Sequence, residues 1–358
     1  MITTRRRLDP AIFDLPVEKM RAGWYTDAYF NHARATLLAD GRRPHVLMQV
    51  FQKKDAYLGG MDEALAILKL CAEDWERLTV EALYDGDVIA PFESVLTIDG
   101  DYTAFAHLET PVLGTLARRT LITTNVVRVL EAANGKPLIF MPARHDHHRV
   151  QTGDGYAAYV AGQIIGAPIG VTTNEQASWW GGSGIGTVPH ALISAYGGDT
   201  VAAARHFADW APDDMNVTVL VDFENDSVRT ALDVARALGD RLWGVRLDTS
   251  ESLVDRSLWE ELGDFAPAGV NPRLVWKVRE ALDAAGFPHV RIVVSGGFTE
   301  EKISAFEREG VPVDAYGVGS SLIRGANDFT ADIVVTDGVP TAKAGRRVRL
   351  NPRLEPVA

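Results

Sequence analysis

The chain has 358 residues, of which 46% are hydrophobic and 23% charged, so it is long enough to bury the core of one large domain or two ordinary ones. Its formal net charge of −12 argues against nucleic acid as a general partner, because phosphate backbones require a basic surface, but it is compatible with a local basic pocket for a small phosphorylated ligand. The single cysteine excludes an intrachain disulfide and any cysteine-based zinc site.

The sequence shows no targeting signal. The stretch Met1–Arg7 is basic, but no apolar run follows it, so we expect no signal peptide. No run of about 18 apolar residues occurs, and we therefore expect no membrane span and a cytoplasmic location.

The N-terminal third predicts a compact sheet-and-helix domain of the α+β kind. The aromatic stretch Trp24–Phe30 has two possible roles. It can pack onto the body of the protein or onto a second subunit, or its aromatic rings and its carboxylate can contact a ligand. Apolar periodicity then predicts a strand at His45–Phe51, a helix at Met61–Leu78, a broken strand region at Val88–Asp101 and a long helix at Leu108–Ala133. Cys71 falls on the apolar face of the first helix, and we interpret it as a core residue and not as a nucleophile.

Two loops in the middle of the chain are rich in chemically active residues. The strand-like Leu138–Phe140 leads into the segment Arg144–Arg149, which holds three histidines and an aspartate. This segment is compatible with a metal site, with a basic loop that faces a phosphate or carboxylate, or with a plain solvated loop. The flanking arginines favour the binding of an anion over that of a metal. After a strand at Ile169–Thr173, the glycine-rich Gly181–Gly186 predicts a backbone that folds tightly or lies against a ligand. His190 then opens a helix-like run, and a lone histidine there is more often structural than catalytic.

The stretch from Val217 to Ile323 repeats one pattern four times: a short apolar run ends abruptly in polar or glycine residues, and helix-like segments separate the runs. The runs are Val217–Val221, Leu242–Val245, Val290–Val294 and Val313–Tyr316. Parallel strands separated by helices predict α/β architecture, and in α/β barrels the chemistry lies at the carboxyl ends of the strands. After Ile323 the chain becomes loop-like, and Val334–Pro340 with the basic Lys343–Arg349 fits edge strands that return to the first domain.

The strand ends of this stretch combine both signs of charge with glycines. Arg246 and Asp248 point the same way along one strand, because they are two residues apart, and Asp222 ends the strand before it. Such a cation can hold a phosphate or carboxylate, and such acids can hold ribose hydroxyls, Mg²⁺ or an oxocarbenium-like centre. Gly296-Gly297 and Gly319-Ser320 end the late strands, where backbone N–H groups commonly bind phosphate.

The order of these short motifs resembles the type II phosphoribosyltransferases, and among them the nicotinate phosphoribosyltransferases. The resemblance spans about residues 20–325. The motifs that carry it are Thr26-Asp27-Ala28-Tyr29, Leu108-Glu109-Thr110, Arg144 after Phe140, Thr172-Thr173-Asn174, Gly186–Ala191, Leu220-Val221-Asp222, Gly244–Ser250, Ser295-Gly296-Gly297 and Gly317-Val318-Gly319. Each is short, but their order and number make the whole specific.

The resemblance implies an α/β N-terminal domain on an irregular α/β barrel, assembled as a homodimer with a shared active site. We expect the first domain at residues 1–135 with the return of residues 324–358, and the barrel at residues 136–323. The implied reaction is attack of nicotinate on C1 of phosphoribosyl diphosphate, which gives nicotinate mononucleotide and diphosphate for NAD biosynthesis. The implied cofactor is Mg²⁺, bound with phosphoribosyl diphosphate and ATP. ATP hydrolysis would be coupled through a phosphorylated His190, a ligase-type activity.

The resemblance also implies the catalytic set His190, Asp222, Arg246 and Asp248. Asp222 would orient His190, and Asp248 would face the ribose hydroxyls. The pyridine nitrogen already has a free lone pair at neutral pH, so the reaction needs a positioned nucleophile and charge stabilisation and no general base. No metal site held by the protein alone is expected.

The remaining implied residues bind substrates. Arg144 with Arg246 would grip the nicotinate carboxylate or a phosphate, and Tyr29 would come with Asp27 from the partner subunit to stack on the ring. The 5′-phosphate would be cradled by Gly296, Gly297, Gly319 and Ser320. Two departures from the family pattern stand out: Met141-Pro142 replaces an aromatic-glycine pair, and the histidines that follow Arg144 have no family role.

Thr173 bears on the choice of substrate. Nicotinamide-using relatives carry an acid at this position, which accepts from an amide but repels nicotinate, so a neutral threonine favours nicotinate. Quinolinate-using relatives need a larger basic cluster for two carboxylates, for which the segment Arg144–Arg149 is a candidate, so quinolinate is the alternative substrate. A non-catalytic relative that binds phosphorylated ligands is the alternative from another class of protein.

Overall fold

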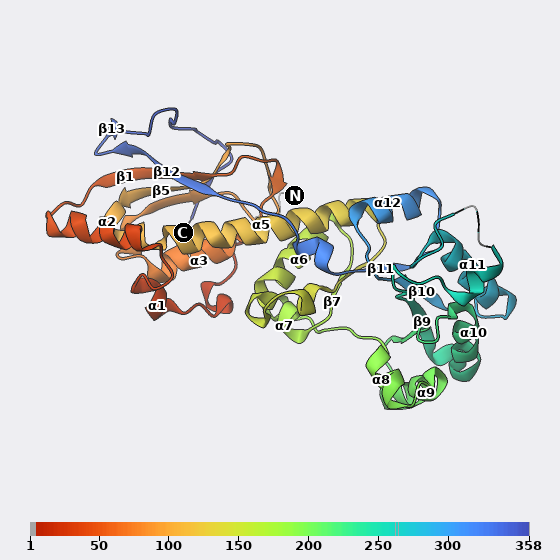
Figure 1. Ribbon diagram of the computed structural model, residues 1–358. Coiled ribbons are helices and arrows are strands. Elements are labelled where there is room, and N and C mark those ends of the chain that lie inside the picture. Colours follow the sequence, from red (N-terminus) through yellow and green to blue (C-terminus); the bar gives the residue numbers. More distant parts are fainter. Residues whose placement is uncertain (1–4, 262, 264, 358) are drawn as a thin grey trace. The chain divides into compact units, whose positions relative to one another are not determined.

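The computed structural model describes residues 5–261, 263 and 265–357 (Figure 1). Residues 1–4 of the basic N-terminal stretch therefore lie outside the described part of the chain. The chain forms two compact units: Met1–Asn125, Tyr156–Ile164 and Gly325–Ala358 make the first, and Val126–Gly155 with Ile165–Arg324 makes the second. The expected boundaries were 135/136 and 323/324. The division differs from them because two helices, α5 (Glu109–Ala132) and α6 (Gln151–Ile165), each contribute residues to both units.

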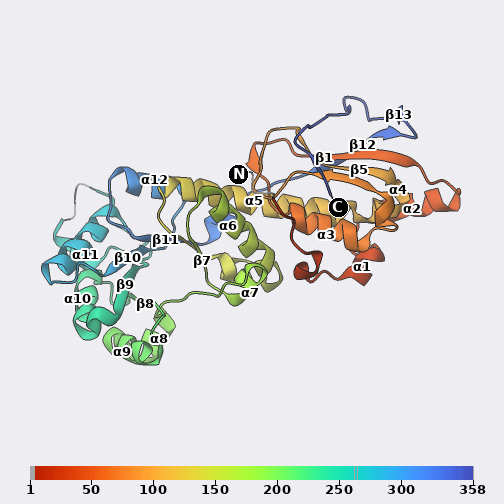
Figure 2. The same ribbon diagram turned by 180° about the vertical axis from the view of Figure 1, so that it is seen from behind.

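The first unit is built on an antiparallel sheet of six strands in the order β13-β12-β1-β5-β3-β14. Its strands are β1 (His45–Phe51), β3 (Thr79–Ala82), β5 (Ser94–Asp101), β12 (Thr330–Thr336), β13 (Val339–Pro340) and β14 (Glu355–Pro356), and a separate pair consists of β2 (Ala56–Tyr57) and β4 (Val88–Ile89). The predicted strand at His45–Phe51 is confirmed as β1. Figures 1 and 2 show β1, β5 and β12 lying along α3 (Met61–Cys71) and the first part of α5.

The C-terminal segment returns to this unit, as predicted, and Val339–Pro340 forms the edge strand β13. Two details of the prediction were wrong: β12 begins at Thr330 and is an interior strand that pairs with both β13 and β1, and Lys343–Arg349 forms no strand. The acid Asp332 is compatible with an interior strand because Arg346 lies 3.1 Å from its carboxylate. The β12 residues Ala331 and Ile333 pack against the core, so this strand supports the whole unit.

The core of the first unit lies between its sheet and the helices α3 and α5. It includes Met48 and Val50 from β1, Leu65 and Leu68 from α3, and Val112 from α5. The other helices of this unit are α1 (Val17–Arg21), α2 (Ala28–Ala39) and α4 (Tyr102–Phe105).

Helix α3 ends earlier than predicted. It stops at Cys71 and does not reach Leu78, because Ala72 is extended and Asp74 takes a left-handed conformation with φ of 49°. Cys71 is buried in the core, as predicted, and burial raises the pKa of its thiol.

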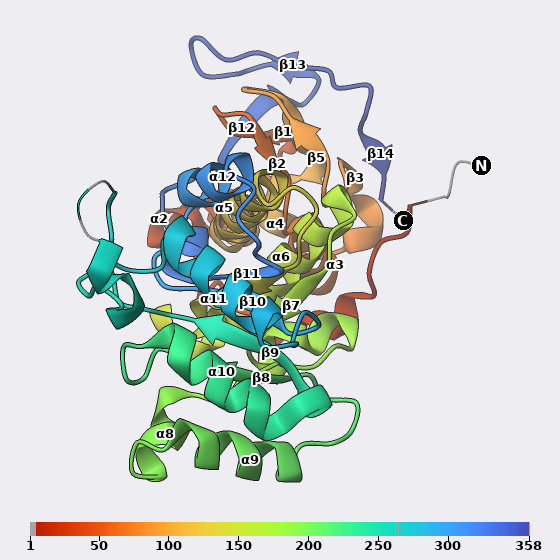
Figure 3. The ribbon, with the colours of Figure 1, turned by 90° about the vertical axis from the view of Figure 1, so that its right-hand side faces the viewer.

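The second unit confirms the predicted alternation of parallel strands and helices. Its six-stranded sheet runs β7-β6-β11-β10-β9-β8, and every pair is parallel. The strands are β6 (Leu138–Phe140), β7 (Ile169–Val171), β8 (Val217–Leu220), β9 (Leu242–Leu247), β10 (Arg291–Val294) and β11 (Ala315–Val318). The helices are α7 (Asn174–Ala177), α8 (His190–Ala195), α9 (Thr200–Trp210), α10 (Ser227–Leu238), α11 (Pro272–Ala284) and α12 (Glu300–Arg308). Figure 3 shows α10 and α11 beside the strands that they connect.

The last strand lies two residues later than predicted. The apolar run suggested Val313–Tyr316, but β11 occupies Ala315–Val318. The Asp314 carboxylate accepts from the backbone N–H of Ile292 at 2.7 Å, so this residue fastens the start of the strand to β10. The shift places Gly319 directly after the strand.

A glycine-rich segment joins the two edges of the parallel sheet. The N–H of Ile185 donates to the carbonyl of Val171 in β7, and the N–H of Val188 donates to Thr218 in β8, each at 2.8 Å. The segment also passes close to the end of β7, since a methyl group on Gly184 would lie 2.8 Å from the backbone of Thr173. The sheet is thus a half-barrel whose open edges are bridged by irregular chain, and the glycines permit the close approach.

Candidate active site

The carboxyl ends of the parallel strands bring the predicted residues of the second unit to one edge of the sheet. Following the sheet order from β6 to β8, the loops carry Arg144, then Gly319-Ser320, then Gly296-Gly297, then Asp248, then Asp222. Parallel strands make this arrangement, because all their carboxyl ends lie at the same edge.

Arg246 is held by a short hydrogen-bonded chain. Its Nε donates to Ser295 Oγ at 2.7 Å, and Ser295 Oγ donates to Asp248 Oδ1 at 2.6 Å. A second guanidinium nitrogen lies 3.3 Å from Asp248 Oδ2, and the side chains of Arg246 and Asp248 are only 18% and 20% exposed. The predicted proximity of Arg246 and Asp248 is therefore confirmed, and Ser295 fixes both groups from the neighbouring strand.

His190 is paired with Asp222. The imidazole Nε2 donates to Asp222 Oδ1 at 3.1 Å, and the Asp222 side chain is 8% exposed. The hydrogen bond to Asp222 raises the pKa of His190 above its ordinary value; Asp248 adds to the rise, while burial and Arg246 oppose it. The pairing follows from the bridging segment, because the backbone contact of Val188 with β8 sets His190 beside the end of that strand.

The two glycine turns are linked to each other. Gly296 and Gly297 adopt φ of 83° and 65°, the left-handed region that glycine enters without strain. Ser321 Oγ donates to the carbonyl of Phe298 at 2.9 Å, which ties the turn after β11 to the turn after β10. Beside the first turn, a methyl group on Gly297 would overlap the carboxylate of Glu251.

Thr173 has a structural task that the sequence did not reveal. It is the N-cap of α7: its hydroxyl accepts from the N–H of Gln176 at 3.2 Å and donates to Gln151 Oε1 at 3.0 Å. Its position at the end of β7 agrees with the expected place in the site, but any substitution there must also preserve this cap.

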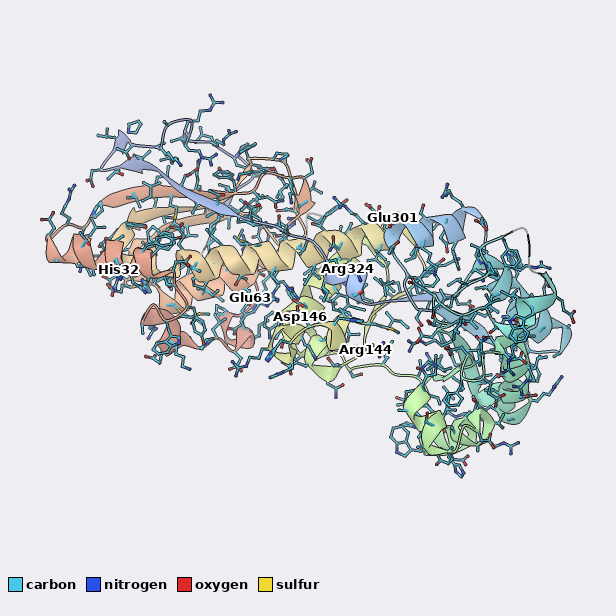
Figure 4. The ribbon with its side chains drawn as sticks, viewed as in Figure 1. His32, Glu63, Arg144, Asp146, Glu301 and Arg324 are labelled. Carbon is cyan, nitrogen blue, oxygen red and sulfur yellow. The ribbon has the colours of Figure 1, made fainter. Side chains whose placement is uncertain are left out.

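The basic loop after β6 forms two short turns. Arg144 and His145 end the first turn, Pro142–His145, and both are exposed. Figure 4 shows Arg144 and Asp146 on this loop. Among the described residues, no three His, Cys, Asp or Glu side chains are grouped closely enough to hold a metal ion.

Asp27 and Tyr29 belong to the first unit, at the start of α2. The Tyr29 hydroxyl donates to Asp27 Oδ2 at 3.3 Å, and Thr110 donates to the same oxygen at 3.1 Å. Both side chains are exposed, so this tyrosine and carboxylate form a group of their own on the surface of the first unit.

Sequence reasoning missed Ser295, Gln151 and Glu251 as parts of the site. Ser295 was visible only as the residue before Gly296, and Gln151 and Glu251 stand outside every short motif. Nothing in local sequence signals these contacts, because each joins segments that the topology brings together.

The arrangement can hold an anionic, hydroxyl-bearing ligand. Arg246 offers a fixed cation, the glycine turns offer backbone N–H groups, and Asp248 with Asp222 offers carboxylates for hydroxyls. These acids are also the oxygen ligands that Mg²⁺ prefers, so the donor set fits a magnesium ion that arrives with a phosphorylated ligand.

The chain is similar to known phosphoribosyltransferases. A family model described as "Quinolinate phosphoribosyl transferase, N-terminal domain" matches residues 27–120. The nicotinate phosphoribosyltransferase pncB1 of Mycobacterium tuberculosis is 32% identical over 276 residues, which cover 75% of this chain and 56% of that protein. The chain thus spans about half the length of the curated relatives that it matches.

Solved structures agree in fold. A nicotinate-nucleotide pyrophosphorylase from Pyrococcus furiosus superposes with a TM-score of 0.80 and 31% identity, covering 99% of this chain and 86% of that one. The human nicotinic acid phosphoribosyltransferase has a TM-score of 0.66 at 18% identity, covering 90% of this chain and 77% of that one, and bears on the fold alone. The predicted combination of an N-terminal α/β domain and an irregular α/β barrel is confirmed; the first is built on an antiparallel sheet and the second is a parallel half-barrel. No helix in the described residues is long and apolar enough to cross a membrane.

Proposed function

This chain belongs to the type II phosphoribosyltransferase family, and we propose that it transfers the phosphoribosyl group of phosphoribosyl diphosphate to nicotinate. The products are nicotinate mononucleotide and diphosphate. The observation that carries the proposal is the fixed Arg246–Ser295–Asp248 chain beside the His190–Asp222 pair, all at one edge of the sheet.

Each part of the proposed reaction has a residue suited to it. Asp248 accepts from the ribose hydroxyls, and the turns at Gly296-Gly297 and Gly319-Ser320 receive the 5′-phosphate through backbone N–H groups. Arg246 and Arg144 bind the nicotinate carboxylate or a phosphate by charge-assisted hydrogen bonds. The pyridine nitrogen attacks C1 without a general base, so the protein contributes mainly positioning and charge stabilisation. Asp222 and Asp248 would help to hold a Mg²⁺ ion that arrives with phosphoribosyl diphosphate, and the chemistry that such an ion supplies is neutralisation of charge on the diphosphate.

His190 is the proposed acceptor of a phosphoryl group from ATP. One ring nitrogen donates to Asp222, which leaves the other nitrogen for phosphorylation. We further propose a homodimer in which the partner's Asp27 and the partner's Tyr29 complete the nicotinate pocket.

The neutral Thr173 favours nicotinate over nicotinamide, because a carboxylate at this position would suit an amide and repel an acid. Quinolinate is the second candidate, and two observations favour it: the match of residues 27–120 to a quinolinate family model and the exposed basic loop around Arg144.

A turnover assay separates these candidates. The protein is incubated with phosphoribosyl diphosphate, Mg²⁺ and ATP, and with nicotinate, nicotinamide or quinolinate in parallel. We expect mononucleotide from nicotinate; product from quinolinate alone would overturn the proposal, and binding of phosphoribosyl diphosphate without any turnover would favour a non-catalytic binder.

The coupling to ATP has its own test. His190→Ala should abolish stimulation by ATP and the incorporation of radiolabelled phosphate from ATP, while mononucleotide formation without ATP persists. Unchanged stimulation in this variant would refute the role of His190 as the phosphoryl acceptor.

A further inference from the structure

The three histidines that follow Arg144 have different surroundings. The rings of His147 and His148 stack on each other with centroids 4.1 Å apart, and His147 Nδ1 accepts from the backbone N–H of Arg149 at 3.2 Å. Both are occupied in shaping the second turn of the loop. His145 ends the first turn instead and lies against another strand's loop.

His145 approaches the turn that follows β11. A methyl group on Gly319 would lie 3.0 Å from His145 Nε2, closer than about nine in ten real contacts of a β-carbon. The imidazole therefore packs closely on Gly319, and a side chain at position 319 would require the ring to shift. The carbonyl of Met141 lies 3.6 Å from the same point, so the whole loop start packs on this turn.

The turn that His145 approaches is hydrogen-bonded to its neighbour, and together they form a double turn. Ser321 Oγ donates to the Phe298 carbonyl at 2.9 Å and joins the Gly319-Ser320 turn to the Gly296-Gly297 turn. The His145 ring therefore lies beside a pair of linked turns. The ring is also exposed, so a ligand can reach it from solvent.

The ring nitrogen of His145 beside Gly319 is placed to meet an anion. The neighbouring Asp146 carboxylate accepts from the backbone N–H of His147 at 2.7 Å and so helps to shape the next turn of the loop. His145 Nε2 can donate to an anion that the backbone N–H groups of the double turn also bind, and hydrogen bonds to a phosphoryl oxygen are among the stronger ones.

We propose that His145 is a binding residue for the phosphoryl group of phosphoribosyl diphosphate at the Gly319-Ser320 turn, and that His147 and His148 are structural. The assignment rests on the proposed function, since it names a side-chain donor for the same phosphate. It assigns a role to His145, one of the histidines after Arg144 for which the family motifs give none.

The test compares two substitutions of His145. His145→Leu removes the donor at similar size, and His145→Gln keeps an N–H group at about the same distance from the backbone. We expect His145→Leu to raise both the KM and the calorimetric Kd for phosphoribosyl diphosphate about tenfold or more, the range of one charge-assisted hydrogen bond. His145→Gln should restore most of that loss, and the KM for nicotinate should stay unchanged in both variants.

His148→Leu is the matched control, because it alters a histidine of the same loop that stacks on His147. Unchanged phosphoribosyl diphosphate affinity in His145→Leu, or an equal loss in His148→Leu, would overturn the assignment. A rise in the KM for nicotinate alone would contradict it as well, by placing His145 at the acceptor.

The binding measurement separates this inference from the proposed function. If the unaltered protein binds phosphoribosyl diphosphate but does not turn over nicotinate, the proposed function fails while the ratio of Kd values still judges His145. If the unaltered protein binds no phosphoribosyl diphosphate, both are wrong.

Discussion

At the scale of single residues, the His190–Asp222 hydrogen bond determines how the site titrates. The carboxylate favours the charged imidazolium and raises the pKa of His190. A group whose folded pKa is raised stabilises the fold below its ordinary pKa of about 6.5, and this stabilisation is lost as the pH rises through the folded value.

We expect Asp222→Asn to lower the pKa of His190 toward its ordinary value, because the substitution weakens the hydrogen bond that is the main cause of the rise and removes the negative charge that adds to it. The measurement is a titration of the His190 ring followed by NMR, with the free energy of unfolding determined across the same pH range. The variant should lose stability mainly on the acid side. An unshifted His190 pKa would show that the pair does not persist in solution.

Thr173 combines a helix cap with a place near the proposed acceptor, so its substitutions separate charge from structure. Thr173→Asp keeps an N-cap oxygen but adds a negative charge, and we expect it to raise the KM for nicotinate by at least about tenfold with little change in stability. Thr173→Asn, which caps and stays neutral, is the control. Thr173→Ala should lower the free energy of unfolding by about 1 kcal/mol. Equal KM values for the Asp and Asn variants would contradict the charge argument.

At the scale of elements, the turn after β10 is the most constrained part of the site. Gly297 has positive φ, and the space beside it is filled by the Glu251 carboxylate. A side chain here is therefore disfavoured by the backbone, and the exposed Glu251 side chain would also have to move away.

Gly297→Ala should lower stability by about 1–2 kcal/mol and weaken the binding of phosphoribosyl diphosphate. Gly286→Ala is a matched control, because Gly286 also has positive φ, 86°, but no atom lies within 4 Å of an added methyl group. It should show comparable strain with unchanged binding. Denaturant unfolding and calorimetry measure the two effects, and equal binding losses in both variants would indicate a general effect of strain and not of the turn.

Elements formed by local signals were predictable. The strand His45–Phe51 follows from its apolar pattern, and one of the helix-like segments between the strands is α10, which begins at a local cap where the Asp226 side chain accepts from the N–H of Arg229. Only the end of β12 was predicted, as part of Val334–Pro340; its first residues include Asp332, whose carboxylate is paired with the distant Arg346.

At the scale of the whole molecule, the first unit depends on both ends of the chain. Strand β12 pairs with β1 over six residue pairs, and Phe329 just before it is part of the core. Residues 325–358 thus complete a sheet whose other interior strands come from the first third of the sequence.

A chain that ends at Arg324 should lose the cooperative unfolding of the first unit, because β1 becomes an unpaired edge and the core loses Phe329. A chain that ends at Thr341 keeps β12 and β13 and serves as the control; it should be destabilised less. Thermal unfolding and amide hydrogen exchange at β1 measure the difference. Full protection of β1 in the shorter chain would show that this strand does not need β12.

The sequence by itself determined the parallel strand–helix alternation, the strand ends that carry Asp222, Arg246 and Asp248, and the glycine turns. These follow from periodicity and capping, which act over a few residues. Only the tertiary structure decided that Val188 bridges to β8, that Ser295 links Arg246 to Asp248, and that His145 lies over Gly319. Each of these contacts joins segments about 30 to 170 residues apart, so it depends on the order of strands in the sheet, which no local pattern encodes.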